Sequence, residues 1–208
     1  MTDKTNKDYI IIALKLLIIC SIVALIVALV NLITKEKIAF NEKENTAASL
    51  TDIFNEDFGA KAFTIDNDGF VIKEKQDVVA RCIVAECPLN KDVKALYIIE
   101  DSQKNPLFYC VSISPMGFKA EISMLVAINS DLTVKGVKII SMSETSGIGT
   151  KAMEPSFLTK FNGVTEVGAK NVDVISGATK TTRPVIDAVA NACNQVSIYK
   201  AESGGANQ

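Results

Sequence analysis

A continuous apolar segment near the amino terminus constrains this chain most. Residues 16–33 read LLIICSIVALIVALVNLI, and at the rise of an α-helix they extend over roughly 27 Å, enough to cross the hydrocarbon core of a bilayer. The apolar residues 9–14 lengthen the segment across Lys15, whose ammonium can reach the membrane interface from near a helix end. The sequence therefore predicts a transmembrane helix over residues 9–34 that contacts the lipid bilayer, after a cytoplasmic tail over residues 1–8.

A cleaved signal peptide is the alternative interpretation of this segment. The segment ends in Thr-Lys-Glu-Lys, however, without a small-residue cleavage site. Charge leaves its orientation open, because the flanking lysines are balanced: Lys4, Lys7 and Lys15 on one side, and Lys35, Lys37 and Lys43 on the other. Since the preceding tail is short and everything that could fold follows the helix, we expect a single-pass signal anchor in the cell membrane, with its C-terminal domain on the extracytoplasmic side.

The remainder of the chain predicts one domain of the α+β class. Leu50, Ile53, Phe54 and Phe58 have the spacing of a short amphipathic helix, and we expect residues 35–59 to form a stalk that contains it. Beyond the stalk, β-rich runs and turn-forming residues alternate. The runs cover residues 70–72, 95–99, 107–113, 121–128 and 133–140, and the turns lie at 66–69 and 129–131. They predict a twisted, mainly antiparallel sheet with flanking helices over residues 60–202, before a flexible tail over residues 203–208.

Composition excludes several classes of function. The 22 lysines and arginines nearly balance the 24 aspartates and glutamates, which gives no electrostatic reason to expect a nucleic-acid partner. The chain has no histidine, the commonest general base and metal ligand. Its cysteines, at positions 20, 82, 87, 110 and 193, lack the spacing of zinc or iron–sulfur ligands. We therefore expect no metal, and we interpret Cys82, Cys110 and Cys193 as packed thiols because their neighbours are apolar.

The last regular element is predicted to be a helix, since Val185, Val189, Cys193 and Val196 recur every three or four residues and share one face. The segment just before it, residues 173–179, reads DVISGAT and connects a β-like run to that helix. The first turn of a helix presents unpaired backbone N–H groups and a partial positive charge. Such a junction suits a phosphate group.

The side chains at this junction fit the same interpretation. Gly177 and Ala178 let the backbone approach a ligand closely, and Lys180 adds a mobile cation. The hydroxyls of Thr179, Thr181 and Thr182 can donate to a phosphoryl group or be esterified by one. The alternative is an ordinary capped turn, with Thr182 as the N-cap and Pro184 in the first turn, and the composition of the segment does not decide between the two.

The pattern Asp-x-x-Ser-Gly-Ala-Thr resembles the flavinylation motif of the covalent FMN-binding domain family. Its fixed positions here are Asp173, Ser176, Gly177, Ala178 and Thr179. The resemblance implies that FMN is bound as a phosphoester to Thr179 and that a separate flavin transferase attaches it outside the cytoplasm. It also implies that Lys180 stabilises the phosphodiester charge. Asp173 would order the turn or help the transferase to activate Thr179, or it is an ordinary Asx-type turn residue.

A second stretch, residues 143–149, reads SETSGIG and resembles the Glu-Thr-x-Gly-(Leu/Ile)-Gly loop beside the flavin in the same family. The matching residues are Glu144, Thr145, Gly147, Ile148 and Gly149. The resemblance implies that the glycines admit a flat ring, that Thr145 forms hydrogen bonds and that Ile148 lies against the isoalloxazine. An ordinary glycine-rich connection is the alternative. A histidine often precedes this loop in relatives, but Ser143 stands here.

A weaker match lies at residues 117–122, which read GFKAEI, where relatives carry an aromatic, glycine-rich turn that enters a strand. Lys119 and Ala120 depart from that pattern. Phe118 can be a core residue or a contact of the flavin, and the sequence leaves both open.

The size of the domain and its single anchor resemble the G subunits of Rnf complexes. That resemblance implies an electron-transfer subunit of a membrane complex that couples ferredoxin:NAD electron transfer to Na⁺ or H⁺ translocation, with membrane and redox subunits as partners. We find neither a glycine fingerprint for NAD nor an iron–sulfur motif, so the chain is not expected to be a complete enzyme, and Thr179 is a tether without a catalytic role. The alternatives are a C subunit of the sodium-pumping NADH:quinone oxidoreductase, a flavin reductase, and an exported binding module without flavin.

Overall fold

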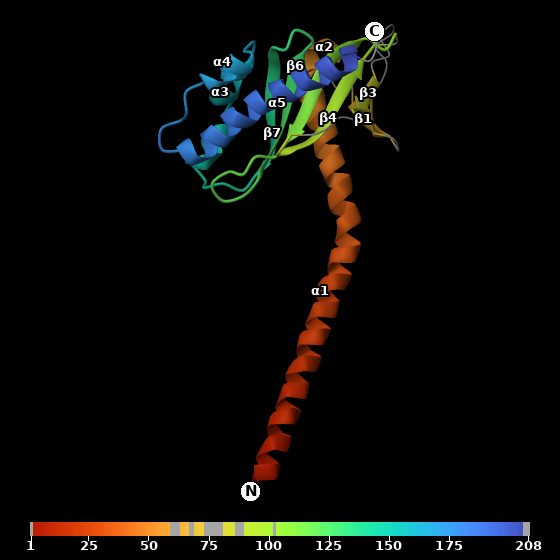
Figure 1. Cartoon of the computed structure of the whole chain (residues 1–208), viewed down its shortest axis with the longest axis vertical. Coiled ribbons are helices and arrows are strands. Elements are labelled where there is room, and N and C mark those ends of the chain that lie inside the picture. The colour runs from red at the N-terminus through yellow and green to blue at the C-terminus, as the bar shows by residue number, and fades with distance from the viewer. Residues whose placement is uncertain are drawn as a thin grey trace. The chain divides into compact units, whose positions relative to one another are not determined.

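The computed structural model describes residues 2–58, 63–66, 69–72, 81–85, 90–101 and 103–205. The chain divides into two compact units, Met1–Lys43 and Glu44–Gln208. Figure 1 shows the elements of both units.

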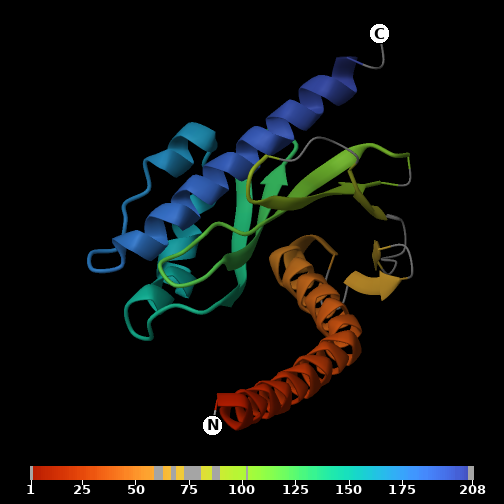
Figure 2. The ribbon, with the colours of Figure 1, turned by 60° about the horizontal axis from the view of Figure 1, so that its bottom comes forward.

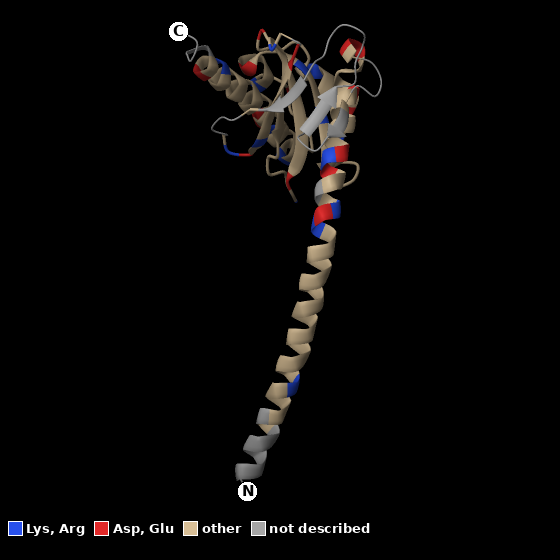
Figure 3. Ribbon diagram, turned by 90° about the vertical axis from the view of Figure 1, so that its right-hand side faces the viewer, with Lys and Arg blue, Asp and Glu red and all other residues tan. Residues whose placement is uncertain are grey.

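Helix α1 (Thr2–Ile53) contains the apolar segment of the first unit. Neither glycine nor proline interrupts these residues, and a helix satisfies its own backbone hydrogen bonds, as a bilayer requires. A candidate membrane span, Ile11–Ile53, includes an 18-residue window with a mean hydropathy of 3.1. Figure 3 shows the long uncharged stretch of this helix between its charged residues. By length and composition, the predicted helix is therefore present as a candidate span.

The second unit is built on one antiparallel sheet of seven strands in the order β1-β2-β3-β4-β5-β6-β7. The strands are β1 (Phe63–Asp66), β2 (Gly69–Ile72), β3 (Arg81–Val84), β4 (Val93–Glu100), β5 (Pro106–Ile113), β6 (Ile122–Asn129) and β7 (Val134–Met142). Each strand pairs with the next one along the chain. The predicted antiparallel sheet and the α+β class are confirmed, and the β-rich runs of the sequence fall on β2, β4, β5, β6 and β7.

Of the two predicted turns, one is fully described. The Leu132 amide donates to the Asn129 carbonyl at 3.0 Å, which reverses the chain between β6 and β7. Asp66 and Gly69 face each other at the ends of β1 and β2, as a reversal requires, whereas residues 67 and 68 lie outside the described residues.

Alternating side chains of the central strands supply two cores, one on each face of the sheet. Ile98, Val111 and Val126 point to one face. Their neighbours Ile99, Cys110 and Leu125 point to the other. Each face must therefore be covered by other elements of the unit.

Helix α5 (Thr179–Gly205) covers the first face, as Figure 2 shows. The predicted buried stripe is confirmed, because Val185, Val189, Cys193 and Val196 are all buried. Shorter helices flank it: η1 (Gly149–Met153), α3 (Pro155–Leu158), η2 (Thr159–Phe161) and α4 (Glu166–Lys170). Residues 203–205, which we predicted to be a flexible tail, continue α5 to Gly205, and residues 206–208 lie outside the description.

The second face is covered by residues that we expected to form a stalk. Leu50 and Phe54 are fully buried, at the end of α1 and just before α2 (Asn55–Phe58). They pack with Phe63, Ile99 and Leu125. The amphipathic spacing of this segment therefore indicates a helix that buries one face in the folded unit. That unit begins at Glu44, before the buried residues.

Cys110 and Cys193 are buried, in agreement with their interpretation as packed residues. Burial raises the pKa of the Cys193 thiol to about 11, so this thiol is protonated at neutral pH and unreactive. The side chain of Cys82 and the whole of Cys87 lie outside the described residues.

Candidate functional site

The turn before α5 is a tight reversal that requires Gly177. The Ala178 amide donates to the Ile175 carbonyl at 2.9 Å, and Gly177 has a φ of +80°. A positive φ at the third residue of such a turn favours glycine, because a Cβ there is strained. The Ala178 carbonyl then accepts from the Thr182 amide at 2.9 Å, and helix α5 starts at Thr179.

The residues before this turn do not form the β-like run that we predicted. Residues 173–175 have no regular secondary structure. Val172, Val174 and Ile175 instead pack, partly buried, against the core beneath α5. These residues are apolar because they contact the core under α5, and they do not pair with a strand of the sheet.

Thr182 lies inside α5, so it is not the N-cap that the alternative of an ordinary capped turn assigned to it. Its hydroxyl donates to the Ala178 carbonyl at 3.1 Å and accepts from the Ile175 amide at 3.3 Å. Its side chain is fully buried. Thr182 therefore braces the turn from within the helix, a role that sequence analysis missed, although threonine commonly bonds the carbonyl four residues before it.

Thr179 is exposed at the first position of α5, and its neighbours Ser176, Gly177 and Lys180 are also exposed. The amides of Thr179 and Lys180 have no acceptor within the helix, because the first four N–H groups of a helix precede its hydrogen-bonding pattern. The partial positive charge of the helix start is therefore presented to solvent beside the Thr179 hydroxyl. This arrangement can bind or carry a phosphoryl group.

The loop after β7 places Ile148 at the surface. The Thr145 carbonyl accepts from the Gly149 amide at 2.8 Å and from the Ile148 amide at 3.2 Å. Gly147 has a φ of +73°, and its amide donates to the Thr150 hydroxyl at 2.9 Å. The loop is thus closed on itself by its own backbone, and the Ile148 side chain remains 51% exposed.

Phe118 lies on the hairpin turn between β5 and β6 and is 55% exposed, so it is not a core residue. The turn is closed by the Gly117 amide, which donates to the Ala120 carbonyl at 2.8 Å. The Lys180 ammonium lies 5.1 Å from the centroid of the Phe118 ring, within the range of a cation–π interaction. This contact joins the weakest sequence match to the first turn of α5.

The Glu144 carboxylate connects the three sequence-predicted segments. One oxygen accepts from the Lys119 amide at 2.9 Å, and the other accepts from the Thr181 hydroxyl at 3.0 Å. Thr181 is buried, and its hydroxyl is engaged by Glu144. The turn at 117–120, the loop at 144–149 and the start of α5 therefore meet at one side chain.

The charge of Glu144 is stabilised by these donors. Partial burial raises the pKa of Glu144, but the hydrogen bonds from the Lys119 amide and the Thr181 hydroxyl, with further bonds from the Phe118 and Ala120 amides, outweigh it. The pKa of Glu144 consequently lies below its ordinary value, and the side chain is ionised at neutral pH.

Two glycines leave room for Glu144. A Cβ added to Gly117 would lie 2.4 Å from the Oε1 atom of Glu144, and one added to Gly149 would lie 2.7 Å from the Cβ of Glu144. Gly149 is buried, so its missing side chain accommodates the glutamate from this side. No role for Gly117 could be predicted from the sequence, because its neighbour in space, Glu144, is 27 positions away in the chain.

Asp173 is a residue of the predicted set that is not joined to the Glu144 group by any contact of the described residues. It is exposed. Within the described part of the chain, no hydrogen bond or ion pair involves its carboxylate.

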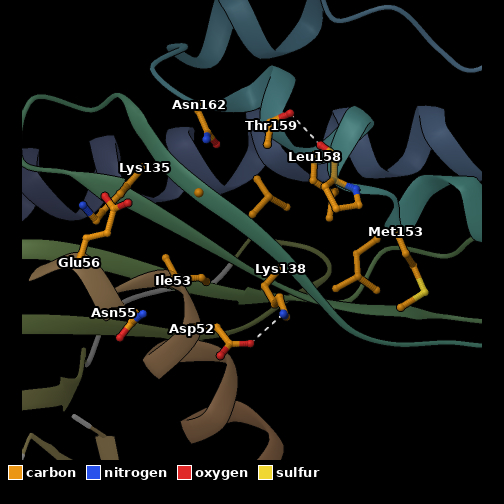
Figure 4. A pocket seen from close by; sticks show the side chains of 14 residues that line it. Asp52, Ile53, Asn55, Glu56, Lys135, Lys138, Met153, Leu158, Thr159 and Asn162 are labelled. Carbon is orange, nitrogen blue, oxygen red and sulfur yellow. Dashed lines mark hydrogen bonds and ion pairs between the residues drawn. The ribbon is translucent and has the colours of Figure 1, made fainter. Parts of the chain in front are cut away.

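Two pockets lie outside this group of residues or at its margin. A pocket of about 550 Å³ runs along β7 beside the Asp52–Lys138 ion pair, and Figure 4 shows side chains of α1, β7 and η2 that line it. None of the predicted site residues lines it. A second pocket of about 460 Å³ borders the site, between Met116 on the hairpin turn and Pro184 on α5.

Two family models match this chain. Residues 117–194 match the model of the FMN-binding domain, a range that contains every residue of the site described above. Residues 1–53 match the model of the RnfG N-terminal region, which covers the candidate membrane helix. Residues 117–194 are thus similar to FMN-binding domains, and they follow the candidate membrane span.

Curated relatives give a more particular likeness. The chain is 34% identical over 105 residues to the G subunit of the ion-translocating oxidoreductase complex of Methanosarcina acetivorans, covering 47% of this chain and 55% of that protein. It is 32% identical to the G subunit of the proton-translocating ferredoxin:NAD(+) oxidoreductase complex of Clostridium ljungdahlii, covering 44% and 54%. The match therefore spans about half the length of these two relatives. The corresponding G subunit of Aliivibrio fischeri is 24% identical, covering 92% of this chain and 90% of that one.

Among solved structures, the chain is similar to NqrC of Shewanella oneidensis, with a TM-score of 0.41, 23% identity, and coverage of 55% of this chain and 70% of that one. The resemblance to the FMN-binding domain family and to the G subunits of Rnf complexes, inferred from the motifs, is confirmed by the family models and the curated relatives.

Proposed function

We propose that this chain is an electron-transfer subunit of a membrane-bound Rnf-type complex and that it carries FMN as a phosphoester on Thr179. The observation that carries the proposal is the exposed Thr179 hydroxyl at the first position of α5, within the residues that match the FMN-binding domain. The relatives named as G subunits of ion-translocating complexes support the assignment to this kind of complex.

The attachment step needs a separate flavin transferase and FAD as the donor. The Thr179 oxygen attacks the phosphorus on the FMN side of the FAD diphosphate, a new P–O bond forms, and the bond to the AMP phosphate breaks. AMP leaves, and the threonine proton passes to a base of the transferase. The product would be a phosphodiester with one negative charge, and the amides of the helix start and the Lys180 ammonium would stabilise it.

When bound, the isoalloxazine accepts and releases one or two electrons. The residues of this chain hold and shield it. Phe118 and Ile148 are exposed apolar side chains on two loops that Glu144 joins to the start of α5. Such side chains gain by covering a flat aromatic ring, since contact removes apolar area of both from water. Thr179 remains a tether and takes no part in electron transfer.

We further propose that the domain lies on the extracytoplasmic side of the cell membrane, anchored by α1. The remaining partners would be the membrane and redox subunits of the complex, with ferredoxin and NAD binding elsewhere. Ion translocation would also belong to the partners, because the apolar stretch at residues 16–33 carries no ionisable carboxylate.

Intact mass spectrometry of the full chain, expressed with and without a flavin transferase, tests the attachment. We expect the mass of FMN less one water, located on the Thr179 peptide and absent from Thr179→Ala. Thr165→Ala is the matched control, because Thr165 is another exposed threonine at a helix start and makes no side-chain capping bond. An unmodified wild-type chain, next to a known acceptor that the same transferase does modify, would favour the flavin-free binding module.

A further inference from the structure

Glu144 occupies an unusual position for a glutamate in a surface loop. Its carboxylate accepts hydrogen bonds from the Lys119 amide and from the hydroxyl of the buried Thr181. Within the part of the chain that the structure describes, no lysine or arginine forms an ion pair with it. The carboxylate is therefore held by amide and hydroxyl donors alone, which bind only at defined distances and angles.

Two glycines, Gly117 and Gly149, leave space for the Glu144 side chain. The space next to Gly117 and Gly149 is filled by Glu144 atoms, at distances that leave no room for a Cβ. The hydroxyl of Thr181 would lie 3.2 Å from a Cβ on Gly149, so the loop and α5 are also in close contact here. A smaller or repositioned side chain at residue 144 would leave a buried hydroxyl and several amides without their acceptor.

The three segments that Glu144 joins each carry one exposed residue of the flavin site. Phe118 follows Gly117 on the hairpin turn, Ile148 precedes Gly149 in the loop, and Thr179 lies two residues before Thr181. Among the hydrogen bonds of the described residues, none joins the side chain of Phe118, Ile148 or Thr179 to Glu144. Through its hydrogen bonds, the glutamate can set the separation and orientation of the three segments.

We propose that Glu144 is a positioning residue. Through Thr181, it fixes the first turn of α5, which carries Thr179, relative to the turn that carries Phe118 and to its own loop. We call this set of hydrogen bonds the lock. The proposal rests on the proposed function in one respect, that Thr179 is the acceptor. The lock itself exists before any flavin is attached and can be measured without it.

The Thr181 hydroxyl gives the sharpest test, because valine has nearly the shape of threonine but cannot donate a hydrogen bond. We expect Thr181→Val to slow FMN attachment by about tenfold, the effect of losing one hydrogen bond to a charged group. Thr181→Ser keeps the hydroxyl and should rescue the rate. Thr165→Ala, remote from Glu144, should leave the rate as in wild type.

Hydrogen exchange of the unmodified full chain provides the readout that does not depend on flavin. We expect Thr181→Val and Glu144→Ala each to speed amide exchange in the peptide containing residues 117–120, and Thr181→Ser to restore protection. The effects should not add, so the double variant should resemble Glu144→Ala alone.

The outcomes separate the two proposals. Faster exchange at 117–120 with no FMN on any chain would retain the lock and contradict Thr179 as the acceptor. Normal exchange and normal attachment in Thr181→Val would overturn the lock and leave the acceptor intact. Additive effects of the two substitutions would also overturn it, since they would show that Glu144 and Thr181 act separately.

Discussion

Two regions of the folded unit are stabilised by different kinds of interaction. On the face covered by the end of α1, Phe54 is packed against the rings of Phe58, Phe63 and Phe108, with centroids 5.1 to 6.1 Å apart. At the proposed flavin site, the hairpin turn at Lys119 and the first turn of α5 both donate hydrogen bonds to the Glu144 carboxylate. Apolar contact is non-directional, whereas hydrogen bonds fix position. The first region should therefore determine how stable the unit is, and the second how accurately its loops are placed.

Phe54→Ala should have the largest effect on stability. Removing a fully buried ring that contacts three others leaves a cavity, and we expect a loss of about 3–5 kcal/mol in the free energy of unfolding. Denaturant unfolding of the full chain, followed by far-UV circular dichroism, measures it. Folded molecules of the variant should still accept FMN at the wild-type rate. A folded variant that accepts no FMN would break the proposed separation of the two regions.

Gly117→Ala should perturb the site more than the fold. The new Cβ would lie 2.4 Å from the Glu144 oxygen and 2.9 Å from the Ala120 carbonyl oxygen, and both must shift. We expect a cost of about 1–3 kcal/mol from overpacking and a slower FMN attachment. Gly136→Ala is the matched control, because a Cβ there makes only ordinary contact with Ile53 at 3.5 Å. Equal effects of the two substitutions on attachment would contradict a specific role for the space beside Glu144.

Acid should weaken the site before it weakens the aromatic region. Because the folded pKa of Glu144 lies below its ordinary value, this group stabilises the fold above the unfolded pKa of about 4.3 and loses that contribution as pH falls through the folded pKa. The stability difference between wild type and Glu144→Gln should therefore be constant near neutral pH and should shrink in acid. Unfolding curves of both proteins at several pH values measure this difference. A difference that grows in acid would contradict an ionised Glu144 in the lock.

Lys138→Met should have the smallest effect. Its ion pair with Asp52 is 2.8 Å long but exposed, with 43% and 62% of the two side chains accessible. We expect a change of about 0.2–1 kcal/mol, which salt should reduce. Unfolding at low and high ionic strength provides the measurement. Lys135, whose ammonium lies 5.0 Å from the Phe108 ring and 2.9 Å from Asp57, should matter more.

The regular secondary structure of the fold could largely be predicted from the sequence. Strands β4 to β7 and the buried stripe of α5 follow from alternation and from the three- and four-residue spacing, which record which side of an element is buried. The same rule misled us at residues 173–175, whose apolar side chains face a core without joining the sheet. It also predicted a stalk where Leu50 and Phe54 enter the core, because amphipathic spacing does not name the surface that a helix covers.

The predicted site residues were found through short motifs, but their connections were not. Glu144 bonds a backbone amide 25 positions before it and a hydroxyl 37 positions after it. A backbone amide is present at every residue except proline, so no sequence signal marks the one that Glu144 selects. The bracing by Thr182 had a local signal, its four-residue distance from Ala178, and could have been proposed.

The order of the strands bears on when the turn at Thr179, the proposed site of FMN attachment, can form during folding. Neighbouring strands pair locally and can assemble early, whereas α5 joins the unit through distant contacts, such as the Asn90 amide with Gln195 and the Lys200 ammonium with the Ser130 carbonyl. The turn that presents Thr179 is braced by residues of α5 itself. Modification would then mark only chains that have completed folding, and attachment of the cofactor would act as a quality check on the finished domain.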